Sequence, residues 1–507
     1  MMALDKSKVL DRQEPIRIPL AGTYNNRTFT NLIGAPSSSG IVGLGVVGVM
    51  IVGSISQNSK DQRYINCFTE KLINPLTTKE TFYCTKRPGF ETVNTPRTGY
   101  GGTAIRLWAG KGNGADVISA FGTTTSNIYN GTVSLGTLAN VARDITETTA
   151  TGTATLVIPC ENGTAYYYPD GGAMTQITDG DFPSSNVGTF VHIDGYCAIM
   201  DSTGLIYTSD LNSVANWTAG NTIKAQMYSD SGVGLIRYKQ YVIAFGSETM
   251  EMFFNAGVTP GSPLARVEQG FSRIGCISSR AMTQSEDNIY WIASTDIGSF
   301  AVYTMNGNQP QRISTPFVEA QIALAFGGTI DVSTAKIFGK TFVFIQTGSG
   351  QTYVYSVEDN MWHEWTGTAR LWYRFAGNTK ATNVMYAISR ESTSGKVYRI
   401  NPASPVFQDD SNNYTVTIQT SKLDNGTTYR KFLARLELIG DQQMSTTPVD
   451  IVWSDDDYQT WSTARQVDMM NERAYIKQLG SFRRRAFKFT NTSNSPLRLE
   501  AIEVDIE

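Results

Sequence analysis

Short runs of apolar and β-branched residues recur along most of this chain, and polar turn residues separate them. Runs such as "GYCAIM" at 195–200, "QYVIAFG" at 240–246 and "NIYWIAS" at 288–294 have the length and composition of β-strands. Between such runs stand dipeptides that tolerate the positive φ angles of two-residue hairpin turns. They are Asn130-Gly131, Asn162-Gly163, Asp170-Gly171, Asp194-Gly195, Asn306-Gly307 and Asn425-Gly426. The pattern predicts antiparallel strands joined by tight hairpins.

A tyrosine-rich strand followed by a polar turn returns about every 40 to 50 residues, which is the period of a four-stranded propeller blade. The repeated phrases are "SNIYNGTVSLGTL" at 126, "TAYYYPDGGAMTQIT" at 164, "GLIYTSDLNSVANWT" at 204, "MEMFFNAGVTPGSPLARV" at 250, "SFAVYTMNGNQPQRIS" at 299, "QTYVYSVEDNMWHEWT" at 351 and "GKVYRINPASPVF" at 395. Such a unit needs neighbours to bury its faces. We therefore predict an all-β protein with a β-propeller of six or seven blades.

The repeat stops after Pro405, and this sets the predicted domain boundaries. Residues 1–60 are expected to form an N-terminal arm with an apolar, glycine-rich insert, and residues 61–405 the propeller. Residues 406–507 contain further alternating segments, such as "KFLARLELIG" and "PLRLEAIEVDIE", and predict a separate antiparallel β-sandwich. Helix is expected only briefly, as in "TPFVEAQIALAF" at 315–326, where Pro316 suits a first helical turn.

The apolar insert carries a glycine pattern that imitates a dinucleotide-binding turn. Gly43, Gly45 and Gly48 have the G-x-G-x-x-G spacing, and Glu70 lies near the expected position of a ribose-binding acid. That motif requires a strand before it and a helix after it. Only two apolar residues precede it, and the following "VMIVGSISQNSK" is β-branched rather than helix-forming. We therefore expect no bound cofactor.

Membrane insertion is a minority interpretation of the same insert. The run from Ile41 to Ile55 is shorter than the roughly twenty residues of a membrane-spanning helix. It begins forty residues into the chain, and the N-terminus has no apolar stretch, so we expect no secretory signal. Buried or interface strands are the expected structure, and a loop that touches a membrane is the alternative.

The charge balance argues against a general nucleic-acid-binding surface. The chain of 507 residues has a formal net charge of −3, whereas phosphate binding depends on Lys and Arg. The one basic run is "FRRRAFKF" at 482–489, which places Arg483, Arg485 and Phe487 on one face of a strand. A solvated strand face is the expected role, and a nucleic-acid site is the alternative.

The sequence offers little material for catalysis or metal binding. The five cysteines, Cys67, Cys84, Cys160, Cys197 and Cys276, are far apart and contain no C-x-x-C pair, so they are expected to be reduced core residues. The two histidines, His192 and His363, form no zinc pattern, and His363 in "MWHEW" is expected to be packed and hydrogen-bonded. We predict no catalytic residue, no metal site and no enzymatic activity.

A hairpin motif in the C-terminal region resembles the Asp-box of propeller proteins. Its pattern S-x-D-x-G-x-x-W is matched by Ser454, Asp456 and Trp461, with Tyr458 in place of glycine. In such a turn the carboxylate accepts backbone N–H bonds and the tryptophan packs beneath. The motif is structural. Paired carboxylates, clustered arginines and a nucleophilic tyrosine would be needed for a sialidase-like hydrolase, and none converge in the sequence.

Ten phrases in the chain resemble, in order, the packaged-DNA stabilisation proteins of short-tailed bacteriophages. They are "IPLAGTYNNR" at 18, "DQRYINCFTEK" at 61, "KRPGFE" at 86, "ITDGDFP" at 177, "VHIDGYCAIM" at 191, "LARVEQGFSRIGCISSRAM" at 264, "NIYWIAS" at 288, "NGNQPQRIST" at 306, "SDDDYQTWS" at 454 and "LGSFRRRAFKF" at 479. The resemblance implies a structural protein of the virion, assembled in the host cytoplasm. It would form a tail nozzle that retains the packaged genome and becomes its exit channel.

The same resemblance implies the partners. They are further copies of this chain in a ring, commonly a hexamer, the portal and adaptor above, and tail needle, fibre or tailspike proteins around or below. Contact with the genome would be transient and non-specific. The alternative is a glycan-binding or glycan-hydrolysing propeller with arginines and carboxylates in a hub pocket, but "RIST" at 312–315 belongs to the phage resemblance and has no counterpart expected in a glycosidase.

The apolar insert departs from the resemblance, because the family pattern is short between "IPLAGTYNNR" and "DQRYINCFTEK". A monomer could hardly expose so large an apolar patch. We therefore expect the insert to pack between subunits or to constrict the lumen as a gate. The candidate residues are Ile41, Val42, Leu44, Val46, Val47, Val49, Met50, Ile51 and Val52.

Overall fold

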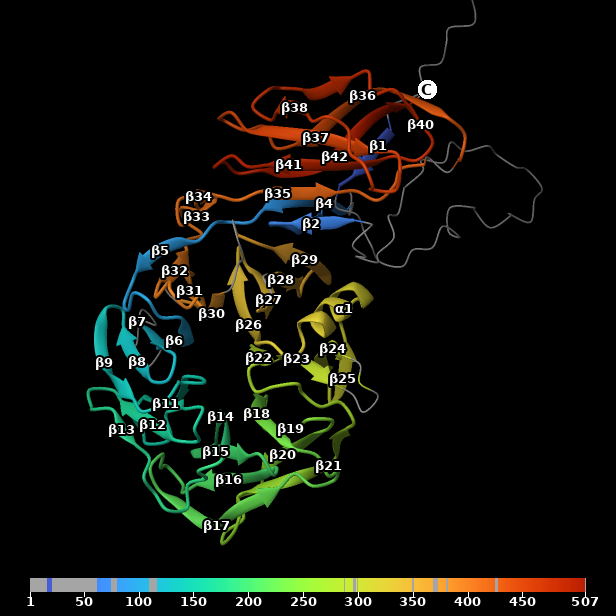
Figure 1. Cartoon of the computed structure of the whole chain (residues 1–507). Helices are drawn as coiled ribbons and strands as arrows, with labels where there is room; N and C mark the ends of the chain where they lie inside the picture. The colour runs from blue at the N-terminus through green and yellow to red at the C-terminus, as the bar shows by residue number, and fades with distance from the viewer. Residues whose placement is uncertain are drawn as a thin grey trace, which may run out of the picture. The chain divides into compact units, whose positions relative to one another are not determined.

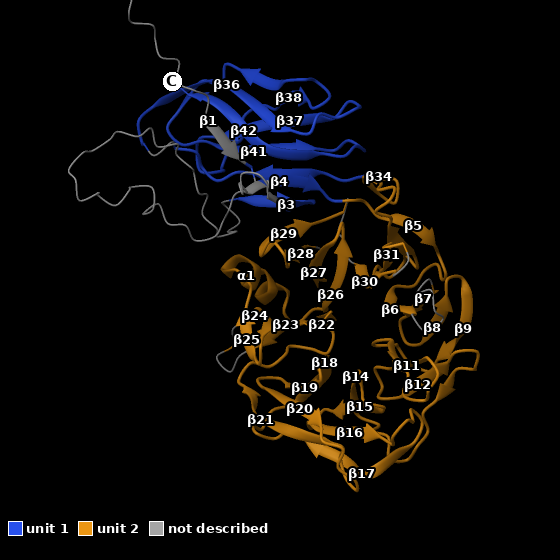
Figure 2. Cartoon of the chain, turned by 180° about the vertical axis from the view of Figure 1, so that it is seen from behind, with its two compact units in different colours: residues 1–87, 413–507 blue, residues 88–412 orange. Residues whose placement is uncertain are grey.

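The computed structural model divides the chain into two compact units (Figure 2). Unit 1 comprises residues 1–87 and 413–507, and unit 2 comprises residues 88–412. The residues that the structure describes are 16–20, 62–73, 80–108, 116–286, 288–294, 298, 300–348, 351–367, 373–379, 382–424 and 427–506. Among them strands predominate and a single α-helix occurs, so the predicted all-β class is confirmed.

Unit 2 is a β-propeller of seven four-stranded antiparallel blades (Figure 1). Blades 1 to 3 are β6 (Gly102–Trp108), β7 (Asp116–Gly122), β8 (Ser126–Asn130) and β9 (Val133–Leu138); β10 (Thr146–Thr148), β11 (Thr155–Pro159), β12 (Ala165–Pro169) and β13 (Thr175–Gln176); and β14 (Asn186–Ile193), β15 (Tyr196–Asp201), β16 (Leu205–Ser209) and β17 (Trp217–Lys224).

Blades 4 to 6 follow the same order. They are β18 (Gly232–Tyr238), β19 (Tyr241–Gly246), β20 (Met250–Asn255) and β21 (Leu264–Ser272); β22 (Met282–Ser285), β23 (Asn288–Ser294), β24 (Phe300–Asn306) and β25 (Gln309–Arg312); and β26 (Ile330–Ile337), β27 (Lys340–Thr347), β28 (Thr352–Ser356) and β29 (Met361–Trp365). Blade 7 is β30 (Tyr373–Asn378), β31 (Met385–Ser389), β32 (Val397–Ile400) and β5 (Glu91–Asn94).

Blade 7 closes the ring by combining strands from both ends of unit 2. Strand β5 pairs antiparallel with β32, so that Val397 lies opposite Asn94 and Tyr398 opposite Thr92. The first strand of blade 7, β30, contacts the first strand of blade 1, β6. Three strands from the end of the repeat and one from its beginning thus make one blade, and the propeller has no open seam between its last and first blades.

Neighbouring blades bury each other's faces, as the period of the repeat required. Trp108 of blade 1 shares one apolar cluster with Leu156 and Ile158 of blade 2. The opposite face of blade 2 presents Val157 to Trp217 of blade 3 in another cluster. The alternation of side chains along each strand therefore serves two interfaces at once.

The predicted turns that lie in the described residues fall between consecutive paired strands. Asn130-Gly131 connects β8 and β9, and Asn162-Gly163 connects β11 and β12. In the turn between β14 and β15, Asp194 has φ of 47° and Gly195 has φ of 86°, as a primed hairpin turn requires. Asp170-Gly171 and Asn306-Gly307 link β12 to β13 and β24 to β25. Asn425-Gly426 lies outside the described residues.

The predicted helix is also confirmed. Helix α1 (Pro316–Ala325) begins after Thr315, whose side-chain oxygen accepts a bond from the Val318 N–H. Pro316 occupies the first turn, where its missing N–H costs nothing. Among the described residues, no helix has both the length and the apolar character needed to span a bilayer.

Unit 1 is a β-sandwich built from two antiparallel sheets. One sheet has the order β3-β4-β42-β36-β39, with β1 beside β42 and β40 beside β36, and the other contains β2, β35, β41, β37 and β38 in that order. The strands are β1 (Ile16–Pro19), β2 (Arg63–Ile65), β3 (Cys67–Ile73), β4 (Glu80–Lys86), β35 (Val416–Gln419), β36 (Lys431–Gly440), β37 (Pro448–Ser454), β38 (Arg465–Asp468), β39 (Ala474–Lys477), β40 (Ser481–Phe482), β41 (Ala486–Asn491) and β42 (Arg498–Ile506). The short strands β33 (Gln408–Asp409) and β34 (Asn412–Asn413) pair where the two units meet in sequence.

The unit boundaries differ from those expected from the sequence. Residues 61–87 were assigned to the propeller, but β3 and β4 belong to the sandwich, where Cys84 lies opposite Leu499. Strand β1 of the predicted N-terminal arm also joins it, with Ile18 opposite Ile502. These pairings join segments more than 400 residues apart, so no local pattern indicates them. The propeller correspondingly spans 88–412.

Candidate functional site at the propeller hub

A cavity of about 710 Å³ occupies the hub of the propeller. The first strand of every blade contributes to its wall, so seven chain segments that are distant in sequence line one space. Side chains that point inward from these strands have no neighbouring blade to pack against. The hub is therefore the place in unit 2 where polar side chains can gather without disrupting the inter-blade cores.

The charged side chains of the hub are mostly cationic. Those lining the cavity are Arg106, Arg143, Arg237, Arg280, Lys336 and Arg374, together with the acidic Asp144, Glu147 and Glu286. This local excess of positive charge contrasts with the net charge of −3 on the whole chain. A cavity with walls of one predominant sign concentrates ions of the opposite sign.

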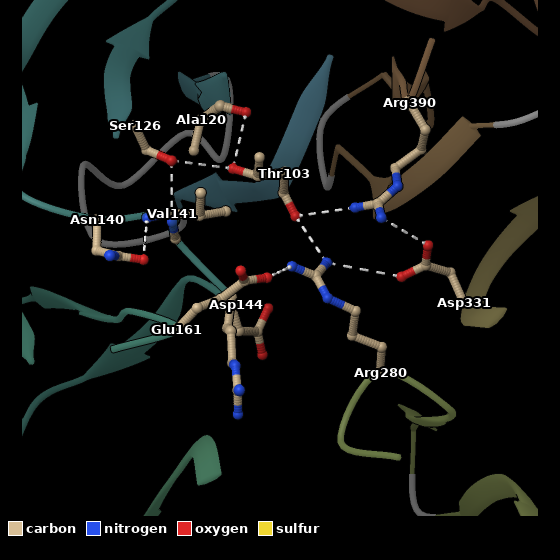
Figure 3. Close-up of polar contacts among 12 residues, drawn as sticks. Thr103, Ala120, Ser126, Asn140, Val141, Asp144, Glu161, Arg280, Asp331 and Arg390 are labelled. Atoms are coloured by element: carbon tan, nitrogen blue, oxygen red, sulfur yellow. Dashed lines mark hydrogen bonds and ion pairs between the residues drawn. The ribbon is translucent and has the colours of Figure 1, made fainter. Parts of the chain in front are cut away.

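Three arginines converge on a single backbone oxygen, and Figure 3 shows two of them, Arg280 and Arg390. The carbonyl of Thr103, in β6, accepts bonds from Nη1 of Arg280 at 3.2 Å and Nη1 of Arg390 at 3.3 Å. Nη1 of Arg374 approaches the same oxygen at 3.5 Å. The Thr103 hydroxyl is held separately, because it donates to the Ala120 carbonyl at 3.3 Å. The arginines come from the loop before blade 5, from β30 and from the residue after β31.

Carboxylates from other blades neutralise these arginines. Asp331 of β26, only 2% exposed, lies 3.0 Å from Nη2 of Arg390 and 3.7 Å from Nη1 of Arg280. Glu161 contacts Arg280 at 3.1 Å (Figure 3). In the same region Asp144 lies 3.0 Å from Arg374. The network ties blades 1, 2, 6 and 7 to one another and to the loop before blade 5.

Burial and crowding of like charges weaken the protonated forms of two hub arginines. Burial, helped by the nearby Arg280 and Arg374 guanidiniums, lowers the pKa of Arg390 to about 10, and Asp331 opposes this shift. Burial also lowers the pKa of Arg143, with Arg280 adding to the effect and Glu161 opposing it. With a pKa of about 10, Arg390 still carries charge at neutral pH. The hub thus holds more positive charge than its acids fully compensate.

The hub does not have the chemistry of a sialidase. Arginines and carboxylates do gather there, which is one feature that the glycan alternative predicts. However, Arg280, Arg374 and Arg390 are paired with acids, and no tyrosine is found among the described residues lining this cavity. The described residues of the cavity wall thus supply no tyrosine of the kind that sialidases use as a nucleophile. Within the described part of the chain, no group of three or more His, Cys, Asp or Glu side chains is placed to hold a metal ion.

The nine residues predicted as a subunit interface or gate lie outside the described residues. They are Ile41, Val42, Leu44, Val46, Val47, Val49, Met50, Ile51 and Val52, and their role stays a prediction. The glycines of the dinucleotide-like motif lie in the same segment. Glu70, the acid that accompanied that motif, is in β3 and pairs with Arg498 Nε at 3.0 Å. Its observed partner is a cation within the sandwich.

The cysteines are core residues, as expected, and His363 is packed in the core as predicted, whereas the hydrogen bonding expected of its side chain stays a prediction. All five cysteines are free and buried, and burial raises the pKa of both Cys160 and Cys197 to about 11. His363 is buried in β29, and burial, with a contribution from Lys340, lowers its pKa to about 3. The imidazole is therefore neutral under ordinary conditions.

The interpretation of "FRRRAFKF" as a solvated strand face is wrong for two of its residues. Strand β41 begins only at Ala486, and Arg483 is exposed, but Phe487 is fully buried and Arg485 is 2% exposed. The Arg485 guanidinium makes two bonds to Asp455, of 2.7 and 2.8 Å, and one to the Leu479 carbonyl at 2.7 Å. A buried cation is tolerated because all of these oxygens surround it.

The Asp-box turn has the predicted geometry. Asp456 accepts the Thr460 N–H at 2.9 Å and the Ser454 hydroxyl at 2.8 Å. These bonds, chiefly those from Thr460, lower the pKa of Asp456 to about 2. Tyr458, which replaces the glycine of the pattern, has φ of 65°. Trp461 is half-buried and lies beneath Lys488, whose Nζ is 3.9 Å from the ring centroid.

The hub arginines were not identified from the sequence. They are scattered singly through phrases such as "ARDIT", "SSRAM" and "WYRFA", and none forms a basic run. One regularity could have revealed them. Arg143 and Arg280 stand shortly before the first strands of their blades, and Arg374 is the second residue of β30, so superposing the repeats would place all three arginines near the start of a first strand.

Comparison with known proteins places the chain beside one viral family. Residues 88–355 match the family model described as Phage_stabilise, "Bacteriophage P22 Gp10, beta-propeller". No curated protein matches the sequence. Among solved structures, Raptor from Chaetomium thermophilum is similar at 10% identity and a TM-score of 0.40, over 61% of this chain and 28% of that one. The chain thus spans less than a third of that protein, and this level of structural similarity supports no inference about function.

Proposed function

Since this chain belongs to the phage stabilisation family of the bacteriophage P22 Gp10 β-propeller, we propose that it forms the tail nozzle of a short-tailed phage. In this role a ring of identical subunits retains the packaged DNA and later serves as its exit channel. Membership itself makes the chain a phage structural protein of the virion. The tail position, the ring and the channel are the proposed refinements.

The family match over the propeller is the observation that carries this proposal. The matched residues, 88–355, include the closing strand β5 and the first five blades. They also include blade 6 as far as β28. The match therefore covers the body of unit 2, and the propeller named in the family description is the fold that unit 2 has.

The proposed assembly is a hexameric ring beneath the portal and adaptor, with needle, fibre or tailspike proteins around or below it. Identical subunits with a head-to-tail interface close into such a ring when the rotation between neighbours fits. A net charge of −3 suits a channel wall that must release DNA. Five free, buried thiols suit assembly in the reducing cytoplasm of a bacterial host. The proposed role depends on the shape of the ring and requires no catalytic residue.

A nonsense mutation in the gene tests the retention function. Phage grown without this protein are expected to package DNA and then lose it, leaving nuclease-sensitive genomes and empty heads in electron micrographs. Adding the purified protein to freshly filled heads should restore retention and infectivity. Particles that keep a nuclease-resistant genome without the protein would contradict the proposal.

A further inference from the structure

Three hub cations differ from the rest because, in the described part of the chain, none of them is within ion-pair distance of a carboxylate. Within the described residues, Arg106, Arg143 and Arg237 line the cavity but form no ion pair. By contrast, Arg280 and Arg374 contact acids, and Lys336 pairs with Glu286. The excess positive charge of the hub is therefore carried by Arg106, Arg143 and Arg237.

Arg106 is the most poorly satisfied of the three. It belongs to β6 and lines the hub, and its Nε is buried with no hydrogen-bond acceptor. Buried donors in folded proteins nearly always have a partner, because an unsatisfied donor destabilises the fold, and a charged one does so more strongly. A guanidinium in this condition is a donor prepared for an acceptor that enters the cavity.

Arg143 and Arg237 are held in place by neutral oxygens only. Arg143 donates to the Val187 carbonyl. Arg237 donates from Nε to the Lys239 carbonyl and from Nη1 to the His192 carbonyl, both at 3.0 Å. Backbone carbonyls orient these side chains without cancelling their charge. The side chains are thus positioned while their electrostatic attraction for an anion is retained.

We propose that the propeller hub binds a small phosphate-bearing anion, with Arg106 as a principal ligand and Arg143 and Arg237 contributing charge. A cavity of about 710 Å³ is within the range that holds small ligands, roughly 300–1,000 Å³. Guanidinium groups match the oxygens of phosphate in geometry and charge. A multivalent anion suits a site with several cations, because each of its charges can contact a different guanidinium. Glu147, on the neighbouring first strand β10, also lines the cavity and opposes the binding of anions.

The phosphate can come from a free polyphosphate or nucleotide, or from a terminal phosphate of DNA. This inference rests on the hub geometry and stands apart from the nozzle proposal, because it requires neither a ring nor a tail. Either source uses the same oxygens and the same arginines. The two are separated by the probes used in the test.

Isothermal titration of the full-length protein with sodium tripolyphosphate, at constant ionic strength, tests the site. The wild type is expected to bind, and Arg106→Met, which keeps the apolar stem, is expected to lose at least about tenfold in affinity. Arg106→Lys should recover part of it. Arg483→Met removes the same charge from an exposed position in unit 1 and should bind like the wild type.

A second titration uses a short 5′-phosphorylated single-stranded oligonucleotide. Binding that Arg106→Met abolishes identifies DNA phosphate as a source, and binding of tripolyphosphate alone identifies a free phosphate ligand. Both results support the site. The inference is overturned if the wild type binds neither probe, or if Arg106→Met and Arg483→Met weaken binding equally.

Discussion

A few specific oxygen atoms stabilise the buried charge of the sandwich, and Arg485 is the clearest case. Its guanidinium is 2% exposed, and Asp455 supplies two of the three oxygen atoms to which it donates. The ring of Phe482 lies 4.6 Å from the guanidinium carbon. Aromatic contact and bidentate pairing together make the site specific for arginine rather than for lysine.

Replacing Asp455 with Ala should destabilise unit 1 by about 2–3 kcal/mol, because a buried guanidinium then loses its carboxylate. Glu472→Ala removes the same charge from an exposed position of the same unit and should change stability by less than about 0.5 kcal/mol. Chemical denaturation followed by tryptophan fluorescence measures both. Equal, small effects of the two substitutions would show that the ion pair between Arg485 and Asp455 does not stabilise unit 1.

The Asp-box predicts a specific dependence on pH. Because the pKa of Asp456 falls to about 2 from its ordinary value of 3.8, its stabilising effect is fully present above about pH 4 and is lost as the pH falls toward 2. Asp456→Asn should therefore lower Tm at pH 7, and the difference from the wild type should shrink at pH 2. Calorimetry over this range measures it, and a constant difference would contradict the assignment.

The same residues show what sequence could predict at this scale. The spacing of Ser454, Asp456 and Trp461 predicted the turn, because all of its bonds are local. The burial of Arg485 was not predicted. Its partner Asp455 is 30 residues away in sequence, and a run of three arginines ordinarily indicates a solvated surface.

At the scale of elements, closure of the propeller depends on how β5 is anchored. Phe90, just before this strand, is fully buried and packs edge-on against Tyr373 of β30 with ring centroids 4.8 Å apart. Its N–H donates to Asp409 at 3.1 Å. At Gly89 any Cβ would lie 2.0 Å from the Gln408 carbonyl oxygen, so only glycine fits there. These contacts fix the strand that completes blade 7.

Phe90→Ala should destabilise unit 2 by about 3–5 kcal/mol through the lost burial and the cavity that remains. Val93→Ala changes the same strand at a side chain that is 39% exposed and should cost less than about 1 kcal/mol. Hydrogen exchange should show faster exchange along β5 and β32 in the Phe90 variant only. Similar protection in both variants would contradict the anchoring role.

Local patterns predicted most of the blade strands and the hairpins, because Asn-Gly and Asp-Gly turns bring neighbouring strands together directly. They did not predict β5, since "ETVN" at 91–94 pairs with residues some 300 positions later. They also missed turns with unusual residues, such as Phe338-Gly339 between β26 and β27, where Phe338 has φ of 50°. The required conformation there is set by the blade and not by residue preference.

On the scale of the whole molecule, the sequence predicted two architectures but left the blade number and the boundary open. Seven blades follow from the closing strand, which the repeat pattern alone does not contain. The hub was not predicted either, because its arginines come from separate blades and meet only when the ring closes. Family membership accounts for the virion role, and the geometry of unit 2 adds the cationic hub.

The central claim, a ring that docks on the portal and adaptor, is tested most directly by native mass spectrometry. The purified chain is measured alone and after mixing with a portal–adaptor assembly, with negative-stain images of the mixture. The account predicts a closed hexameric ring of this 55.6 kDa chain on the adaptor. A chain that stays monomeric and does not bind the adaptor under the same conditions would contradict it.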